Sequence, residues 1–269
     1  MAINRIEEFI SAIASIDDEI QTEKLCEKEL EYLRSELALT SVRRAVTRYR
    51  NAIAEISKTH PALKYLKLTR QEQATVKAAT KSQVYSDHTN LRPIDADDLI
   101  IKATELLDST SYLNIALGLM LLTGRRATEI LKTASMTVAT DDSVIFAGQL
   151  KTKGSDNAQT QPYEIPVLTN SQRIVDVLSQ LRQFKDFSSL SNDQVHSRCN
   201  KSLNEYVKKH FGKLIPEVKL KDLRSAYATI CHDLYCPDQI SQTAYFAQIL
   251  GHSKEDLTTA QSYQDFYLI

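Results

Sequence analysis

The fold of this chain is set by the segment LTGRRATEI, residues 122–130. It ends a stretch, 113–122, that is apolar nearly all round a helix, and such a helix is buried. Gly124 is expected to end that helix, because glycine readily adopts the left-handed backbone found at helix C-termini. Arg125 and Arg126 would then emerge at the edge of the core. One of the two must face a cleft or pair with a buried acid.

Outward from this segment, apolar residues at three- and four-residue spacing predict a mostly helical chain. The six glycines and six prolines fall at boundaries. Thr40 or Ser41 is a candidate cap for the third helix, Asp95 caps another, and Ser109 or Ser111 starts the apolar one. The predicted helices span 2–14, 20–38, about 40 to the stop at His60-Pro61, 70–83, 95–107, 109 or 111 to 123, 170–184, 192–211, 220–234, 239–250 and 256–264.

One region of the sequence has the alternation of β-strands. Short strands are predicted at 136–138, 143–146 and 163–167, with a turn at Asp141-Asp142 and a long polar connection at 152–160. Residues 84–94 lack periodicity and contain a proline, which is typical of a linker. We therefore expect a mainly α protein with a small three-stranded antiparallel β-sheet. Its helical first domain would span 1–90 and its second domain 91–269.

The net charge is −1, but the charges are unevenly distributed along the chain. Residues 1–39 hold 4 basic and 10 acidic residues, whereas residues 40–93 hold 11 basic and 3 acidic ones. Phosphate binding needs a local positive face rather than a positive total. The basic segment is either a nucleic-acid face or the solvated side of helices. The candidate DNA-binding residues are Arg43, Arg44, Arg48, Lys77 and Lys81.

Several classes of protein are disfavoured by the sequence. There is no run of 18 apolar residues and no signal-peptide h-region, which favours a cytoplasmic protein. The four cysteines lack a disulfide or zinc spacing, and Cys231 with Cys236 lacks a second ligand pair. No Walker loop and no acidic cluster of metal-binding spacing is present. We expect no cofactor and no metal.

Further motifs follow in a fixed order. They are KTK at 151–153, KDLR at 221–224, LGH at 250–252, and Tyr263, eleven residues after His252. With the Thr-Gly-x-Arg start of residues 123–126, this ordered set resembles the tyrosine recombinase superfamily, which shares its catalytic domain with type IB topoisomerases. The resemblance covers about 92–269 and implies a helical DNA-clamping, core-binding domain before it.

Four longer segments resemble the telomere resolvases, or protelomerases, within that superfamily. They are SKTHP at 57–61, FAGQLKTK at 146–153, PYEIP at 162–166 and AQSYQDF at 260–266. The resemblance implies strand cleavage through a 3′-phosphotyrosyl intermediate, on a palindromic double-stranded site bound by a homodimer, giving closed hairpin ends. A bacterial or phage protein acting on a nucleoid or plasmid is implied.

The resemblance also assigns roles to individual residues. Two arginines would hold the phosphate by bidentate hydrogen bonds. The family position, two after the glycine, selects Arg126 over Arg125, and the second arginine is Arg224. Tyr263 would be the nucleophile, with Tyr267 as its competitor on the same helical face. The catalytic set expected from the motifs is Arg126, Lys151, Lys221, Arg224, His252 and Tyr263.

The remaining assignments leave alternatives open. Lys151 is favoured over Lys153 as the donor of a proton to the leaving oxygen, and Lys153 is then a DNA contact. The spacing from His252 to Tyr263 is eleven where nine is usual, and Lys221 stands where most recombinases carry a histidine. A site-specific recombinase or integrase, a DNA-binding relative without turnover, and an all-α interaction protein are therefore the competing hypotheses.

Overall fold

The computed structural model describes residues 2–16, 18–150, 161–252 and 257–269, apart from the side chains of residues 2–4. The chain divides into two compact units, Met1–Tyr85 and Ser86–Ile269, which we call the amino-terminal and carboxy-terminal units. Each unit has a hydrophobic core of its own. The expectation of a mainly α protein with one small antiparallel sheet of three strands is confirmed.

The amino-terminal unit is built from amphipathic helices. They are α1 (Ala2–Ala14), α2 (Glu19–Glu36), α3 (Leu39–Ile56), α4 (Ala62–Tyr65) and the first part of α5 (Arg70–Thr89). The apolar face of α3 carries Val42, Val46, Tyr49 and Ile53 into the core. In that core the Tyr49 hydroxyl donates a hydrogen bond to the carboxylate of Glu29 at 2.6 Å.

Two details of this unit differ from the sequence expectation. Helix α3 is capped by Ala38 without a side-chain hydrogen bond, so neither Thr40 nor Ser41 is its cap. Helix α5 continues to Thr89, so the prediction of a non-helical linker is wrong for residues 84–89. Val76 is the buried residue of α5, and its later turns are largely exposed. An exposed helix has no apolar face to create the periodicity on which the prediction depended.

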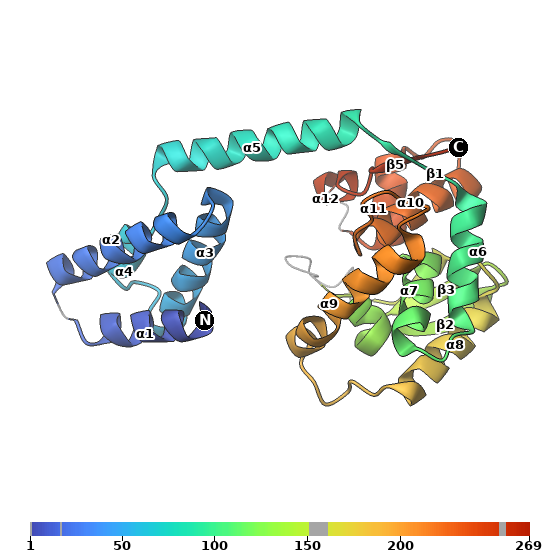
Figure 1. The fold of residues 1–269 in the computed structure, drawn as a ribbon, viewed down its shortest axis with the longest axis horizontal. Helices are drawn as coiled ribbons and strands as arrows, with labels where there is room; N and C mark the ends of the chain where they lie inside the picture. Colours follow the sequence, from blue (N-terminus) through green and yellow to red (C-terminus); the bar gives the residue numbers. More distant parts are fainter. Residues whose placement is uncertain (1, 17, 151–160, 253–256) are drawn as a thin grey trace. The chain divides into compact units, whose positions relative to one another are not determined.

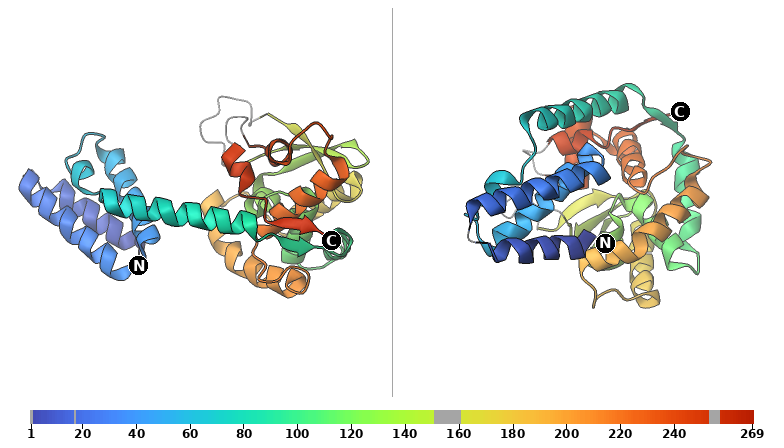
Figure 2. Two further views of the ribbon diagram at one scale, coloured as in Figure 1. Left: turned by 90° about the horizontal axis from the view of Figure 1, so that it is seen from above. Right: turned by 60° about the vertical axis from the view of Figure 1, so that its left-hand side comes forward.

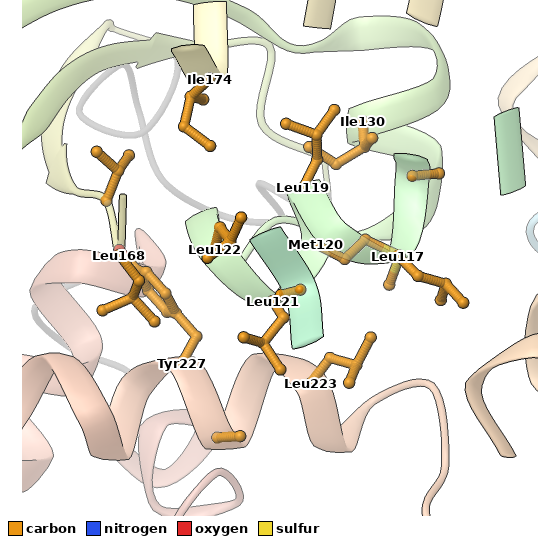
Figure 3. Close-up of a cluster of buried hydrophobic side chains, with 14 of the residues drawn as sticks. Leu117, Leu119, Met120, Leu121, Leu122, Ile130, Leu168, Ile174, Leu223 and Tyr227 are labelled. Carbon is orange, nitrogen blue, oxygen red and sulfur yellow. The ribbon is translucent and has the colours of Figure 1, made fainter. Parts of the chain in front are cut away.

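The carboxy-terminal unit is organised around α7 (Tyr112–Thr123). This helix contacts α6, α8, α9 and α10, which lie around it in Figure 1. Figure 3 shows side chains of α7 packed among Ile130, Leu168, Ile174, Leu223 and Tyr227. The remaining helices of this unit are α6 (Ala96–Leu107), the short π-helix η1 (Glu129–Thr133), α8 (Ser171–Phe184), α9 (Asn192–Phe211), α10 (Asp222–Tyr235), α11 (Gln242–Leu250) and α12 (Leu257–Gln261).

A three-stranded antiparallel sheet of order β2-β3-β4 packs against this helical core. Its strands are β2 (Ser135–Thr140), β3 (Ser143–Ala147) and β4 (Tyr163–Pro166). Phe146 of β3 pairs with Met136 on one side and with Tyr163 on the other. The alternation of the sequence places Val144 and Phe146 inward, where both are fully buried.

A second, parallel pair of strands was not predicted. Strand β1 (Arg92–Ile94) pairs with β5 (Phe266–Leu268), and the two lie side by side in Figures 1 and 2. The register places Arg92 opposite Phe266 and Ile94 opposite Leu268. The pairing brings the end of the chain back to the first strand of the carboxy-terminal unit. Within the described residues, no helix is both long and apolar enough to cross a membrane.

Candidate active site

The first element of the site is the C-terminus of α7. Gly124 caps this helix in the left-handed conformation, with φ 66°, and a Cβ at this position would run into the ring of Tyr227. Only glycine satisfies both the backbone and the close approach of that ring. The chain therefore leaves the core abruptly, and the next two residues diverge.

Arg125 turns into the protein and is fully buried. Its guanidinium donates to the carbonyl of Thr123 at 3.1 Å, to the hydroxyl of Tyr163 at 2.7 Å and to the carbonyl of Ile249 at 2.6 Å. It also lies 4.7 Å from the ring centroid of Phe146. All three of its nitrogens are thus committed to joining α7, β4 and α11.

Arg126 turns the other way and lines a cleft of about 500 Å³. Its guanidinium donates to Glu129 at 2.7 Å and to the carbonyl of Leu150 at 3.1 Å, and 21% of its side chain stays exposed. We expected one arginine to face a cleft or to pair with a buried acid, and Arg126 does both. Both arginines contribute to the lining of the cleft, but Arg125 is fully buried, whereas the side chain of Arg126 stays partly exposed.

Glu129 is a residue of the site to which the sequence assigned no role. Its carboxylate is fully buried and also accepts from the backbone N–H groups of Arg126 at 2.9 Å and Leu150 at 3.0 Å. Burial alone would raise the pKa of Glu129, but the charges of Arg224, Arg125 and Arg126 outweigh it and lower the pKa. The sequence did contain a signal for this carboxylate, because an acidic residue stands three positions after an arginine that follows a buried helix.

Arg224 reaches the same cleft from the first turn of α10. Its side chain donates to the carbonyl of Gly124 and to that of Leu250, the latter at 2.7 Å. Within the described residues its buried Nε has no hydrogen-bond partner. Burial lowers the pKa of Arg224 to about 10, and the charges of Arg125 and Arg126 add to the effect. At neutral pH it is still a cation, held among other cations.

Tyr263 lies beside Arg224, just after α12. Its ring centroid is 5.3 Å from the Arg224 guanidinium carbon and 5.4 Å from the ring of His252, on which it stacks. Burial would raise the pKa of the phenol, but the charges of Arg224 and Arg126, together with their hydrogen-bonding approach, lower it. The site thus makes the phenol of Tyr263 easier to ionise, and the phenolate is the nucleophilic form of tyrosine.

His252 is placed by the end of α11. Gly251 caps that helix in the left-handed conformation, and the backbone N–H of His252 donates to the carbonyl of Ala247 at 2.8 Å. The structure thus brings the rings of His252 and Tyr263 together, despite the eleven-residue spacing between them.

Tyr267 does not share a helical face with Tyr263. Helix α12 ends at Gln261, and Tyr267 lies in β5 with 47% of its surface exposed. That part of the sequence expectation is wrong, because the β1–β5 pairing extends the chain after Tyr263. Within the described residues the cleft is lined by Tyr263 and not by Tyr267.

The predicted lysines divide into two groups. Lys221 lines the cleft at the N-cap of α10, and its ammonium lies 3.5 Å from the carboxylate of Asp265. Lys151 and Lys153 lie outside the described residues. No group of three or more His, Cys, Asp or Glu side chains that could hold a metal occurs in the described part of the chain.

The predicted DNA-binding residues of the amino-terminal unit lie along different surfaces. Arg43 and Lys77 line one groove, together with Lys64 and Lys67 from the α4 region. Arg44 and Arg48 line a separate hollow that also contains Glu36. Lys81 is exposed on α5. The side chains expected to form one basic face on α3 thus point toward two hollows.

The comparison with protein families agrees with this geometry. The model of the telomere resolvase ResT/TelK catalytic domain matches residues 90–266. The chain belongs to this family. The resemblance to telomere resolvases inferred from the motifs is therefore confirmed.

The match to curated telomere resolvases covers only part of the length of those proteins. The protelomerase of Escherichia phage N15 is 23% identical over 243 residues, which are 80% of this chain and 38% of that protein. The telomere resolvase ResT of Borreliella burgdorferi is 21% identical over 152 residues, or 56% of this chain and 33% of that protein. The chain thus aligns with between 33% and 38% of the length of these relatives.

Solved telomere resolvase structures share the fold over nearly the whole chain. A TelA protelomerase point mutant complexed with a DNA hairpin product has a TM-score of 0.91 and 28% identity, covering 99% of this chain and 88% of that one. A second TelA mutant, covalently complexed with substrate DNA, has a TM-score of 0.91 and 29% identity, with the same coverage. Protelomerase TelK complexed with substrate DNA is similar in fold, at a TM-score of 0.66 and 20% identity.

Proposed function

We propose that this telomere resolvase family member cleaves and rejoins DNA through a 3′-phosphotyrosyl intermediate. Its products would be closed hairpin ends formed from a palindromic, replicated telomere. The observation that carries the proposal is the position of Tyr263, whose phenol lies beside two guanidinium groups that lower its pKa. The TelA structures with covalently bound substrate and with hairpin product support the same chemistry and the same outcome.

In the cleavage step, the phenolate oxygen of Tyr263 attacks the scissile phosphorus. A bond from phosphorus to Tyr263 forms while the bond to the 5′ oxygen breaks, leaving a free 5′ hydroxyl. Negative charge builds on the non-bridging oxygens, and we assign its stabilisation to the guanidinium groups of Arg126 and Arg224, which both line the cleft. His252, stacked on Tyr263, would donate to one of the same oxygens.

The leaving 5′ oxygen needs a proton, which we assign to Lys151 by the motif alone. In the joining step, a 5′ hydroxyl of the complementary strand attacks the phosphotyrosine, and the phenol of Tyr263 departs with a proton. Each step exchanges one phosphodiester for another, so neither needs an external energy source. Lys221, held on the cleft by Asp265, is the further cation that we assign to the phosphate.

The proposed substrate implies how the protein assembles. One Tyr263 cuts one strand, so a two-fold palindrome requires two chains, related by the same symmetry. We propose a homodimer on double-stranded DNA, acting in the cytoplasm at a nucleoid or a plasmid. Cations of the amino-terminal unit would contact the phosphate backbone, and Arg43, Arg44, Arg48, Lys77 and Lys81 remain the candidates, with Lys153 in the second unit.

Covalent trapping tests this proposal directly. A duplex nicked next to the cut loses its short 5′-hydroxyl fragment, so the tyrosine linkage accumulates and shifts the protein on a denaturing gel. We expect trapping by the wild type and by Tyr267→Phe, and none by Tyr263→Phe, which should still bind DNA. Trapping by Tyr263→Phe would show that another residue is the nucleophile.

The product can be tested with an intact palindromic duplex. With the palindromic site placed off-centre, each closed hairpin runs on a denaturing gel at twice the length of its own arm. That length differs from either starting strand, because both strands of the arm become one continuous strand. We expect that band with the wild type and its absence with Tyr263→Phe. Recombinant or merely relaxed products would favour an integrase or a topoisomerase instead.

A further inference from the structure

The chain segment that follows Tyr263 is tied tightly to the rest of the carboxy-terminal unit. The backbone N–H of Arg92 donates to the carbonyl of Asp265 at 3.0 Å, and that of Ile269 donates to the carbonyl of Ile94 at 3.1 Å. Between these bonds β1 and β5 pair in parallel. Helix α12, before Tyr263, is only five residues long and buries Ala260. The segment after Tyr263 therefore supplies much of the anchorage of the nucleophile.

Asp265, two residues after Tyr263, connects this segment with the first turn of α10. Its Oδ2 accepts from the hydroxyl of Ser225 at 2.7 Å and lies 3.5 Å from the ammonium of Lys221. Only 11% of the side chain is exposed. Ser225 is the neighbour of Arg224, so one carboxylate contacts the elements that carry an arginine and a lysine of the cleft.

Arg92 makes a second connection between the same two segments. Its guanidinium donates to the buried carboxylate of Asp222 at 2.9 Å and to the carbonyl of Pro216 at 3.2 Å. The same group lies 4.5 Å from the ring centroid of Phe266. Asp222 also accepts from the backbone N–H of Lys219 at 3.1 Å, which fixes it at the start of α10.

We propose that Asp265 and Arg92 are positioning residues that hold Tyr263 in place against Arg224 and Lys221. The proposal rests on the function proposed above and explains why an acidic–aromatic pair follows the nucleophile. Asp265 fixes the chain directly after Tyr263, while Arg92 packs on Phe266 and pairs with the helix that carries Arg224. Neither residue lines the cleft, so neither is assigned contact with the phosphate.

The expected effect of losing either contact is on chemistry rather than on DNA binding. A reacting atom displaced by about 1 Å can lose about 100-fold in rate, because an in-line attack tolerates little misalignment. We expect Asp265→Ala and Arg92→Ala to slow single-turnover trapping on nicked duplex by about 10- to 100-fold. The milder Asp265→Asn, which keeps the shape and loses the charge, should fall between these variants and the wild type.

A matched control exists in the same unit. Arg173 pairs with Asp108 at 2.8 Å on an exposed surface, and neither residue lines the cleft. We expect Arg173→Ala to trap DNA at the wild-type rate. The DNA affinity and the thermal unfolding midpoint of every variant should be measured alongside, so that loss of structure is recognised.

The pH dependence of trapping separates positioning from general stability. Three groups from three elements face the phenol of Tyr263, namely Arg126, Arg224 and His252. A phenol that moves away from the two arginines loses the cause of its lowered pKa. The pH profile of trapping by Asp265→Ala should therefore move to higher pH, whereas that of Arg173→Ala should not.

Two results would overturn the positioning proposal. One is wild-type trapping rates and pH profiles in Asp265→Ala and Arg92→Ala. The other is a loss of trapping that is matched by a loss of DNA affinity and of the folded state in Asp265→Asn as well. Failure of the wild type to trap DNA at all is a different result, which would reject the proposed function itself.

Discussion

At the scale of single residues, the site depends on an excess of positive charge around one phenol. Arg125, Arg126 and Arg224 lie near a single buried acid, Glu129, whose pKa they lower. Burial lowers the pKa of Arg224, and repulsion by the charges of Arg125 and Arg126 lowers it further. Tyr263 lies within this field, which favours its ionised form. An incoming phosphodiester would relieve the repulsion, because it adds negative charge where cations are crowded.

The pH dependence of cleavage should follow from this arrangement. A nearby cation stabilises the phenolate, so removing one raises the pKa of Tyr263. We expect Arg126→Ala to move the rise of the trapping rate to higher pH and to reduce the rate by about 100- to 1000-fold. Trapping kinetics measured from about pH 6 to about pH 10 span the expected rise of the rate and give both effects. Tyr267→Phe is the control. An unmoved profile would mean that Arg126 does not act on Tyr263.

At the scale of elements, the sharp end of α7 decides which arginine is buried. Gly124 adopts a left-handed backbone against the ring of Tyr227, and after it Arg125 and Arg126 bind different partners. Arg224 also donates to the carbonyl of Gly124. One glycine therefore supports the core, the divergence of the arginines and a hydrogen bond of the site.

A substitution of Gly124 should therefore affect stability and function together. We expect Gly124→Ala to cost about 1–2 kcal/mol from the left-handed backbone. The crowding against Tyr227 should add about 1–3 kcal/mol. Urea unfolding followed by circular dichroism measures the sum. A variant as stable as the wild type would contradict the backbone conformation that we describe for Gly124.

Helix α3 carries the second test at this scale, because its arginines point toward two hollows. Each phosphate contact that is lost should reduce the slope of log affinity against log salt by about one. We expect Arg43→Ala and Lys77→Ala to reduce the slope together if their shared groove holds the DNA backbone. Arg44→Ala and Arg48→Ala report on the other hollow in the same filter-binding assay. An unchanged slope in all four variants would place α3 away from the DNA.

The sequence predicted those parts of the site that depend on local signals. Gly124 and the end of its helix follow from composition and spacing, and the ordered motifs pointed to Arg126, Arg224, His252 and Tyr263, which the structure brings close together. It did not predict where Arg125 goes, because its partners Tyr163 and Ile249 are distant in the chain. The motif alone chose between the two arginines, without a physical reason.

The β1–β5 pair was also beyond the sequence argument. Three-residue strands carry too little alternation to be recognised, and their partners lie at opposite ends of the unit. Missing this pair led to the expectation that Tyr267 shares a helical face with Tyr263. The contacts of Asp265 and Arg92 were missed for the same reason, since each is defined by a partner far along the chain.

At the scale of the whole molecule, the chemistry lies within one unit. The described residues that line the cleft run from Met120 to Tyr263, all in the carboxy-terminal unit. The amino-terminal unit has its own core and its own basic grooves. Changes there should alter affinity for DNA and leave the geometry around Tyr263 unchanged.

The pairing of β1 with β5 also fixes which polypeptide supplies each part of a site. Tyr263 is attached to a strand that pairs within its own chain, so nucleophile and arginines come from one molecule. Two defective chains that meet on one palindrome should therefore be unable to complement each other. We expect an equimolar mixture of Tyr263→Phe and Arg126→Ala proteins to trap no more nicked duplex than either alone. Restored trapping would mean that chains exchange their carboxy-terminal strands when they assemble.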